Sequence, residues 1–295
     1  MDFMFLAELV INGALVGMMY GLVALGIVLI YKASGVANMA QGGLTMLGGY
    51  FVWWFSALLS APIWLAALLA MVAMYLVGRL VERAALRRMV GQPVIMVLML
   101  TFGLEIMMRG AAPIVFGSAM RRLDLGFTNA PVMLGEILLN KGYLLGGLIS
   151  LVLIILSLFF FTSRQGIVLR AVSDDQAAAW SVGISVERAV GVAWGLAGIA
   201  AAGAGLVWGS VQGVDWNLSL VLLKAVAVAI LGGFDSIIGV LVAGIVLGVL
   251  ESVIPAYVDG YIGGGSRDVL GSLVILMTML VRPYGFFGRA DIERI

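Results

Sequence analysis

SRQGIVLRAVSDDQAAAWSVGISVER, residues 163–188, is the one long polar segment between apolar runs that end at Phe161 and begin at Ala189. The spacing of its apolar residues predicts a short helix over residues 167–182. Four side chains are expected to share one side of that helix: Leu169, Val172, Ala179 and Trp180. A helix of this length, about 24 Å, is too short and too polar to span a bilayer. The segment is therefore expected to lie at a membrane surface.

The composition of the rest of the chain is that of a polytopic membrane protein. Apolar residues make up 63% of the 295 residues and charged residues only 11%, whereas soluble domains are about 25% charged. The mean hydropathy is +1.14. The chain has no cysteine and no histidine, which excludes disulfides and histidine-ligated metal sites. The N-terminus lacks a basic region, so the first apolar run is predicted to be a retained membrane span rather than a cleaved signal peptide.

The predicted fold class is all-α, with eight to nine transmembrane helices and broken or re-entrant elements. Apolar runs predict spans at about residues 5–31, 62–81, 94–116, 142–161, 189–211, 218–230, 237–254 and 268–281, with a shorter run at 44–59. Residues 34–43 are too polar and glycine-rich for a lipid-facing helix, so a broken or re-entrant element is expected there. Residues 117–141 and 255–267 are expected to be loops. Glycines at intervals of four predict close helix contacts: Gly13, Gly17, Gly21, Gly191, Gly195, Gly205 and Gly209.

The distribution of basic residues predicts the orientation. Ten of the seventeen lie in two connectors and the C-terminal tail: Arg79, Arg83, Arg87, Arg88, Arg164, Arg170, Arg188, Arg282, Arg289 and Arg294. Alternating spans place these three regions on one side, which is then the cytoplasm. We therefore expect the polar segment and the C-terminus to be cytoplasmic.

The sequence offers no enzyme site and no nucleotide site. No G-x-x-x-x-G-K-[ST] loop is present, because none of the three lysines is followed by Ser or Thr. Metal clusters and histidine-based triads are excluded by composition. We therefore predict that this chain is not an enzyme and binds no cofactor.

Ionisable residues within predicted spans are candidates for function, because burying them is costly. Glu105 and Arg109 are four residues apart on one helix and are expected to pair. Lys224 and Glu251 are separated by about 7 Å in depth, so a direct pair between them requires the lysine to snorkel. Alternatively, Lys224 and Glu251 can each contact another helix or anchor its own helix near the membrane–water interface.

Four uncharged or acidic polar residues lie where helices break or end: Asn38, Gln41, Gln212 and Asp215. Hydrogen-bonding groups at such positions could line a pathway for a polar solute. The competing interpretation is that each of them only caps the backbone at a helix end.

Four ordered blocks resemble the signatures of permease subunits of branched-chain amino-acid ABC importers, the hydrophobic amino-acid uptake class. They are YGLVALGIVLIYKASGVANMAQGGLTMLGGY (20–50), GIVLRAVSDDQAAAWSVGI (166–184), KAVAVAILGGFDSIIGVLVAGIVLGVLE (224–251) and VRPYGFFG (281–288). The match runs in order over nearly the whole chain. The first block and the order resemble the H-type subunit more than its longer M-type partner.

The resemblance implies a single transmembrane permease domain over residues 1–295. It implies four kinds of partner. They are a second permease, expected to be a different, M-type chain, two cytoplasmic ATPase subunits that bind ATP and Mg, a periplasmic solute-binding protein, and the bilayer of the bacterial inner membrane. It also implies that residues 166–183 form a coupling helix seated in a groove of an ATPase. The positions that match this signature are Gly166, Arg170, Ala171, Asp174, Asp175, Ala178, Gly183 and Ile184.

Two interpretations of the polar segment therefore remain, a connector lying among lipid headgroups and a docking helix, and the resemblance favours docking. The chain departs from the family pattern at Met39, Gln41, residues 215–217 and residues 237–239, so the solute stays open among amino acids, amides and carboxylates. A second hypothesis from another class is a self-sufficient secondary transporter or channel. It would use Glu105, Asp215, Lys224 and Glu251 to couple to ions.

Overall fold

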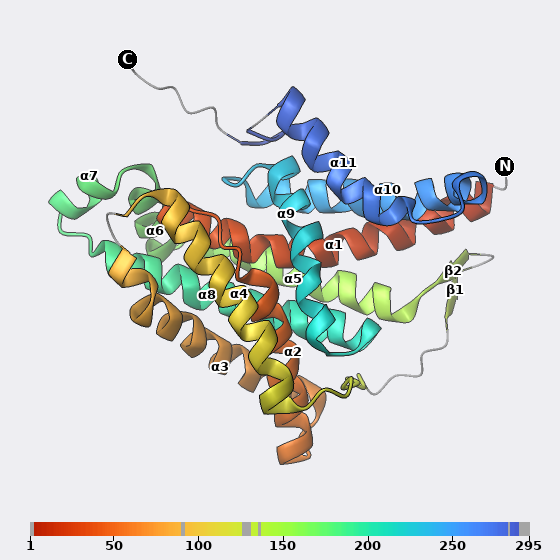
Figure 1. The fold of residues 1–295 in the computed structure, drawn as a ribbon, viewed down its shortest axis with the longest axis horizontal. Coiled ribbons are helices and arrows are strands. Elements are labelled where there is room, and N and C mark those ends of the chain that lie inside the picture. Colours follow the sequence, from red (N-terminus) through yellow and green to blue (C-terminus); the bar gives the residue numbers. More distant parts are fainter. Residues whose placement is uncertain (1–2, 90–91, 126–130, 135–136, 283, 289–295) are drawn as a thin grey trace.

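The computed structural model is a bundle of helices with one short β-hairpin (Figure 1). It describes residues 3–89, 92–125, 131–134, 137–282 and 284–288. The helices of its first half are α1 (Phe3–Ser34), α2 (Gln41–Leu59), α3 (Ile63–Ala84), η1 (Leu86–Met89), α4 (Val94–Phe116) and α5 (Lys141–Thr162). Those of its second half are α6 (Arg164–Asp174), α7 (Gln176–Ser181), α8 (Val186–Gln212), η2 (Trp216–Leu220), α9 (Val221–Gly232), α10 (Ile237–Ile262) and α11 (Ser266–Val281).

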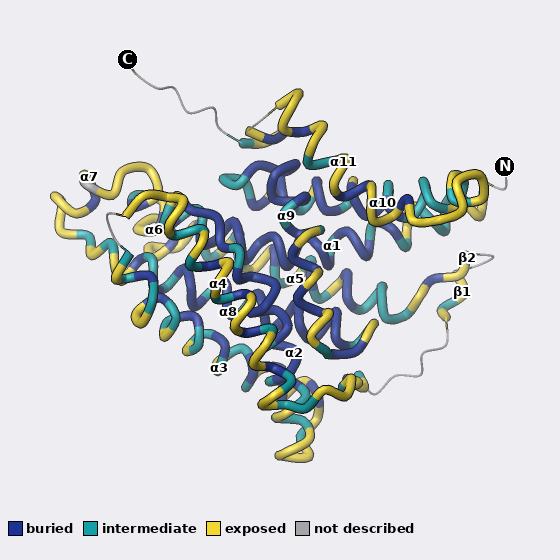
Figure 2. The backbone as a smooth tube through the Cα atoms, in the orientation of Figure 1, coloured by how far each residue is buried: buried dark blue, intermediate teal, exposed yellow. Residues whose placement is uncertain are grey.

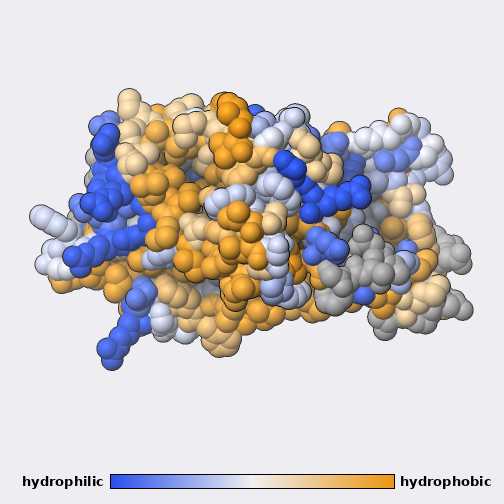
Figure 3. All heavy atoms as spheres, turned by 90° about the horizontal axis from the view of Figure 1, so that it is seen from below, coloured by the Kyte–Doolittle hydropathy of each residue, from blue (hydrophilic) through white to orange (hydrophobic). Residues whose placement is uncertain are grey.

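The predicted class of an all-α polytopic membrane protein is confirmed. Within the described residues, seven helices are long and apolar enough to cross a membrane: α1, α2, α3 with η1, α4, α5, α8 and α10. The segment Trp216–Gly232, formed by η2 and α9, is a shorter apolar helix. In Figure 3 an apolar band separates a hydrophilic end on the left from a second group of hydrophilic residues toward the right.

The two ends of the bundle are built from different parts of the chain. α6, α7 and the C-terminal end of α3 lie at the left end in Figure 1. The N-terminal end of α1, the α10–α11 connection and the hairpin lie at the opposite end. A lipid bilayer around the apolar band would therefore place the two groups on opposite sides of the membrane.

Two predicted loops contain regular structure. Residues 117–141 include an antiparallel hairpin of β1 (Val132–Leu134) and β2 (Ile137–Leu139), in which Val132 pairs with Leu139. The hairpin is held to α1 because Asn12 Nδ2 donates to the Leu138 carbonyl at 3.1 Å. The loop predicted from residue 255 is wrong in its first half, because α10 continues through Pro255 to Ile262. A proline removes only one helical hydrogen bond, so the surrounding helix can continue.

The core of the bundle is formed by α1 and α8, and the helices at its edge face outward (Figure 2). The centre is dominated by small residues on α8, including a buried run from Ala200 to Gly205. By contrast, α4 exposes most of its large apolar side chains, among them Met99, Phe102 and Ile106. Such an apolar surface is expected where a helix contacts lipid or a second membrane subunit.

The glycines of α1 allow α10 to pack against it backbone to backbone, as their spacing predicts. A Cβ atom placed on Gly13 would lie 2.7 Å from the Gly248 carbonyl oxygen. One placed on Gly17 would collide with the Gly244 carbonyl. The helices approach this closely only because both surfaces lack side chains. A glycine of α8 likewise lets that helix lie close to α3, since a Cβ on Gly195 would overlap the Tyr75 ring of α3.

We predict that Gly17→Ala lowers the free energy of unfolding of the detergent-solubilised chain by about 1–3 kcal/mol, because the methyl group forces α1 and α10 apart. Gly103→Ala on α4 is the matched control, since a Cβ there would meet nothing within 4 Å. It should leave stability unchanged or raise it by up to about 1 kcal/mol through helix propensity. The midpoint of unfolding followed by tryptophan fluorescence measures both. Equal effects of the two substitutions would contradict the close contact.

Candidate functional site

The predicted broken element lies between α1 and α2, in the interior of the bundle. α1 ends at Ser34, Gly35 has a positive φ of 70°, and α2 begins only at Gln41. Asn38 and Gln41 have no exposed surface. The start of a helix leaves its first backbone N–H groups without intrahelical partners. At this depth those groups require partners from the protein itself.

Side chains of the break and of α4 supply those partners. Asn38 Oδ1 accepts the Ala40 N–H at 2.9 Å, and Thr101 Oγ1 of α4 accepts the Met39 N–H at 3.2 Å. The carboxylate of Glu105, also on α4, accepts the Gly43 N–H. A carboxylate at a helix N-terminus is further stabilised by the helix dipole. Glu105 therefore caps α2 from a neighbouring helix, while Asn38 and Thr101 satisfy the two N–H groups directly before it.

The predicted ion pair between Glu105 and Arg109 is wrong. Although both are described, their charged groups do not come within the 4.0 Å that defines an ion pair here. Glu105 is 4% exposed and is directed toward Gly43 of α2, while Arg109 is half-buried on the same helix. The Glu105 carboxylate instead supplies the acceptor for the buried Gly43 N–H, which is costly to leave without a partner.

Asn38 and Gln41 are brought together and connect the break to α8. Asn38 Nδ2 donates to Gln41 Oε1 at 3.3 Å, and Gln41 Nε2 donates to the Ala197 carbonyl of α8 at 3.3 Å. Gly26 of α1 makes room for the Gln41 side chain, because a Cβ at Gly26 would overlap its amide. Both residues are closed off from solvent in this conformation, and their contact with a solute stays a prediction.

Gln212 and Asp215 lie apart from that pair, at the end of α8. Gln212 lines an open groove of about 980 Å³ together with three charged residues, Arg122, Asp124 and Lys141. Asp215 does not line this groove. Its Oδ1 accepts the Asn217 N–H at 2.9 Å, so it caps η2. The four candidate pathway residues thus occupy two separate places, and for Asp215 the capping interpretation accounts for its contacts.

Lys224 and Glu251 form a direct ion pair, with 2.7 Å between Nζ and Oε1. The sequence left this pairing open, and the long lysine side chain spans the difference in depth between α9 and α10. Glu251 is 3% exposed and also approaches Arg267 Nε of α11, at 3.6 Å. Tyr20 of α1 donates its hydroxyl hydrogen to Glu251 Oε2 at 3.1 Å. One buried carboxylate therefore joins α1, α9, α10 and α11.

The polar segment forms two helices, α6 and α7, rather than the single helix predicted. The chain is extended at Asp175, with φ −158° and ψ 107°, and the Asp175 carboxylate caps α7 by accepting the Ala178 N–H at 2.9 Å. Gly183, with φ +83°, ends α7 in the left-handed conformation that glycine adopts readily. The Ile184 N–H then donates to the Ala179 carbonyl at 3.0 Å.

α6 is attached firmly to the end of α5. Ser163 alone separates the two helices, and its hydroxyl accepts the Gly166 N–H at 3.3 Å. Gly166 lies directly on the backbone of Phe161, where a Cβ would collide. Arg170 Nη2 donates to the Phe161 carbonyl at 2.6 Å. Of the eight positions that match the coupling signature, Gly166, Arg170, Asp175 and Gly183 therefore shape the segment. Ala171 and Ile184 are half-buried, and Asp174 and Ala178 are exposed.

The exposed surface of this segment includes large apolar side chains. Leu169, Val172 and Ala179, which were predicted to share one side of the helix, are all buried. The placement of Trp180 beside them is wrong, because Trp180 is 75% exposed, as is Val182. Because the chain is extended at Asp175, α7 is not a continuation of α6. The periodicity of one continuous helix therefore does not predict which side chains of α7 are buried. Exposed tryptophan is unusual on a free surface and is enriched in protein interfaces.

The sequence analysis missed that the fourth quoted block packs on the third. Phe286 N–H donates to the Leu231 carbonyl at 2.9 Å, and a Cβ on Gly233 would lie 2.5 Å from the Gly288 nitrogen. Lys32 Nζ at the end of α1 donates to the Asp235 carbonyl of the same turn at 2.7 Å. The glycines of both blocks were the available signal, since backbone contact of this kind requires them.

Comparisons with known proteins agree over the whole chain. Residues 9–282 match the family model described as the branched-chain amino acid transport system permease component. The high-affinity branched-chain amino acid transport system permease protein LivH of Escherichia coli K12 is 26% identical, over 100% of this chain and 99% of its own length. BraD of Pseudomonas aeruginosa, which bears the same description, is 28% identical, over 97% and 96%. A probable LivH of Methanocaldococcus jannaschii is 26% identical, over 95% and 92%.

Among solved structures, a chain of PsaBC from Streptococcus pneumoniae in complex with Fab aligns with 96% of this chain and 94% of its own length. The TM-score is 0.44 and the sequence identity is 16%. A likeness at that level supports no argument about individual residues.

The capping role of Glu105 leads to a prediction about stability. Glu105→Leu should lower the free energy of unfolding by about 1–3 kcal/mol, because it leaves a buried backbone N–H without an acceptor. Glu105→Gln keeps an acceptor oxygen and should retain most of that stability. Arg109→Gln is the matched control, and we expect it to have little effect. A loss of stability in Arg109→Gln as large as that in Glu105→Leu would restore the intrahelical pair and contradict the cap.

Proposed function

This chain belongs to the family of branched-chain amino acid transport system permease components, and from that premise we propose that it moves a branched-chain or related small amino acid, amide or carboxylate into the cytoplasm. It is a transport permease subunit of an ABC importer, of the H type, and not an enzyme in its own right. Its single transmembrane domain spans residues 1–295, with a coupling segment at about 166–183. ATP and Mg are bound by partner subunits, because the chain itself has no phosphate-binding loop.

The observation that carries this proposal is the exposed surface of α6 and α7. Trp180 and Val182 present exposed apolar area, and Asp174 on the same segment is also exposed. Tryptophan is enriched among the residues that contribute most to binding at the centre of protein interfaces. The segment lies at an end of the bundle and outside its apolar band (Figures 1 and 3). We infer that this surface docks into a groove of a cytoplasmic ATPase.

The attachments of α6 explain how movement of an ATPase could reach the transport pathway. α6 contacts α5, α1 and α8, and Arg170 fixes it to the last turn of α5. α8 in turn accepts the hydrogen bond from Gln41 at the break before α2. A displacement of α6 would therefore be transmitted as rigid helix motion to the buried polar pair of Asn38 and Gln41.

We infer the remaining partners from the same premise. They are a second permease, which we expect to be the M-type chain, two ATPase subunits and a periplasmic solute-binding protein. The groove lined by Arg122, Asp124, Lys141 and Gln212 lies at the other end of α8 from the coupling segment. We propose that this end faces the binding protein. The excess of arginine in the connectors supports a cytoplasmic α6, α7 and C-terminus in the inner membrane.

The secondary-transporter hypothesis gains no support from the geometry. It required ionisable groups that could exchange ions along a shared pathway. Glu105 instead caps α2, Asp215 caps η2, and Lys224 is paired with Glu251. These contacts are structural, and they lie in separate parts of the bundle.

We predict that Trp180→Ala weakens association with the ATPase subunits by about 30-fold or more, as expected for a central aromatic contact. ATP-dependent uptake should fall with it, while membrane insertion of the permease is unchanged. Asp174→Lys should also weaken association with the ATPase subunits and lower uptake, because it reverses an exposed charge on the same segment. Co-purification of the ATPase and uptake into proteoliposomes that contain the binding protein measure both effects.

Tyr261→Ala is the matched control, since Tyr261 is 92% exposed at the opposite end of the bundle. It should leave ATPase association unchanged. Full association in Trp180→Ala, or an equal loss in Tyr261→Ala, would rule out α7 as the docking surface.

A further inference from the structure

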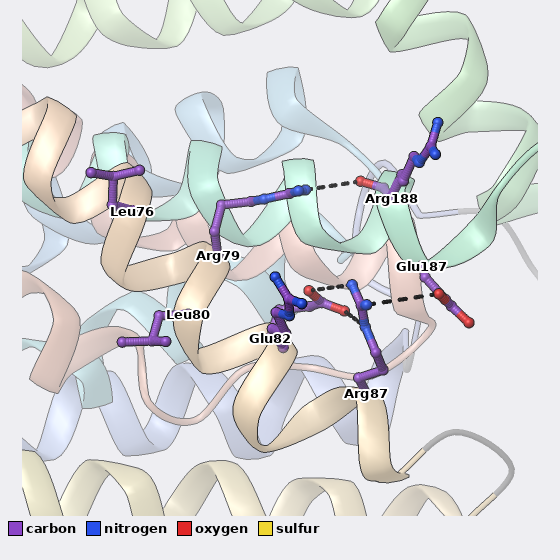
Figure 4. A pocket seen from close by; sticks show the side chains of 8 residues that line it. Leu76, Arg79, Leu80, Glu82, Arg87, Glu187 and Arg188 are labelled. Atoms are coloured by element: carbon purple, nitrogen blue, oxygen red, sulfur yellow. Dashed lines mark hydrogen bonds and ion pairs between the residues drawn. The ribbon is translucent and has the colours of Figure 1, made fainter.

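An open pocket of about 540 Å³ lies between the C-terminal half of α3 and the first turn of α8 (Figure 4). It is separate from the groove at Gln212 and from the break before α2. Eight residues line it: Leu76, Arg79, Leu80, Glu82, Arg83, Arg87, Glu187 and Arg188. The lining thus includes four arginines and two glutamates, and Figure 4 shows that Arg188 turns its backbone carbonyl toward Arg79 and its guanidinium away from it.

Both carboxylates are directed at a single arginine. Glu82 is 2% exposed and accepts two hydrogen bonds from Arg87, at 3.2 Å from Nε and 3.3 Å from Nη2. Glu187 lies 3.9 Å from Nη1 of the same guanidinium. Arg87 is thus neutralised by the protein, and Figure 4 shows the three side chains meeting at one side of the lining.

The pocket keeps a net positive charge, because its four arginines outnumber its two glutamates, and three of the arginines form no ion pair within the described residues. In the described part of the chain, no carboxylate oxygen comes within 4.0 Å of a guanidinium nitrogen of Arg79, Arg83 or Arg188. Arg79 Nη1 donates only to the backbone carbonyl of Arg188, at 3.3 Å. Gly191 holds open the space beside it, since a Cβ there would lie 2.5 Å from Arg79 Nη1. The pocket therefore offers several guanidinium N–H donors to an anion.

The wall of the pocket away from this charge is apolar and faces outward. Leu76 is 61% exposed and Leu80 is 64% exposed, one turn apart on α3. They belong to the outer surface of a predicted membrane span. The pocket thus lies where the apolar surface of α3 gives way to its arginine-rich end. A phospholipid places its phosphate and its acyl chains across the same kind of boundary.

We propose that this pocket binds an anionic phospholipid, with the phosphate held by Arg79 and Arg83 and the acyl chains lying on Leu76 and Leu80. Guanidinium groups form charge-assisted, often bidentate hydrogen bonds with phosphate. A free phosphate would satisfy the arginines but would leave the leucine wall unused. An acidic patch on the ATPase would also pair with the arginines and leave the leucines uncovered, because Leu76 and Leu80 belong to the outer surface of the membrane span. The arginines and the adjoining leucine surface together therefore favour a lipid.

The test measures lipid binding to the purified full-length chain by native mass spectrometry. Dioleoyl phosphatidylglycerol should bind the chain, and the double variant Arg79→Gln, Arg83→Gln should bind it about 30-fold more weakly. Dioleoyl phosphatidylcholine, which has no net charge, should bind weakly to both. The charge-preserving variant Arg79→Lys, Arg83→Lys shows whether the fold is intact and should retain most of the affinity. Arg282→Gln, at the end of α11, is the matched control and should bind like the unmodified chain.

Three results would overturn the proposal. One is a failure of the controls, in which phosphatidylglycerol and phosphatidylcholine bind equally, or in which Arg282→Gln loses as much phosphatidylglycerol binding as the double glutamine variant. Another is binding of inorganic phosphate as tight as that of phosphatidylglycerol, which would make the pocket a free-anion site. The third is loss of ATPase association in the double glutamine variant with lipid binding unchanged, which would make it a protein contact.

Discussion

The fold depends on satisfying the backbone at the buried start of α2. A helix that begins inside an apolar bundle exposes N–H groups that lipid cannot hydrogen-bond. Here Asn38, Thr101 and Glu105 accept them, two of these from α4. This allows the chain to interrupt its helices at a depth where Gln41 can reach the backbone of α8. The break, the buried polar pair and the position of α4 therefore rely on the same few hydrogen bonds.

Small residues make the rest of the arrangement possible. α1 packs on α10 through Gly13, Gly17, Gly244 and Gly248, with carbonyl groups where side chains would otherwise lie. In lipid the association of helices depends on close packing and hydrogen bonds rather than on exclusion of water. The Glu251 carboxylate adds a polar connection among four helices at one end of this contact. The bundle is thus held by backbone proximity along its length and by charge at specific points.

The sequence predicted the features that depend on local patterns. Hydropathy predicted most of the spans, although α9 and α11, at the predicted spans 218–230 and 268–281, are not among the seven described helices long and apolar enough to cross a membrane. Glycine spacing predicted that α1 makes a close helix contact without identifying α10 as its partner, and polarity predicted the break near Asn38. It did not predict contacts between distant residues, such as that of Glu105 with Gly43, 62 positions away. It also misplaced Trp180, because one aspartate, Asp175, interrupts the helix and changes which side chains face outward. Helical periodicity cannot report a break that is set by a single capping residue.

We propose that ATPase subunits bind the segment outside the apolar band and that their movement displaces α5 and α8. The absence of cysteine from the sequence allows this proposal to be tested by single-cysteine labelling in cells. Val182→Cys should resist a membrane-impermeant thiol reagent until the cells are permeabilised, and it should then be protected by the assembled ATPase. Tyr261→Cys should be labelled in intact cells once the outer membrane is made permeable. Labelling of Val182→Cys from the periplasm, or no protection by the ATPase, would contradict the account.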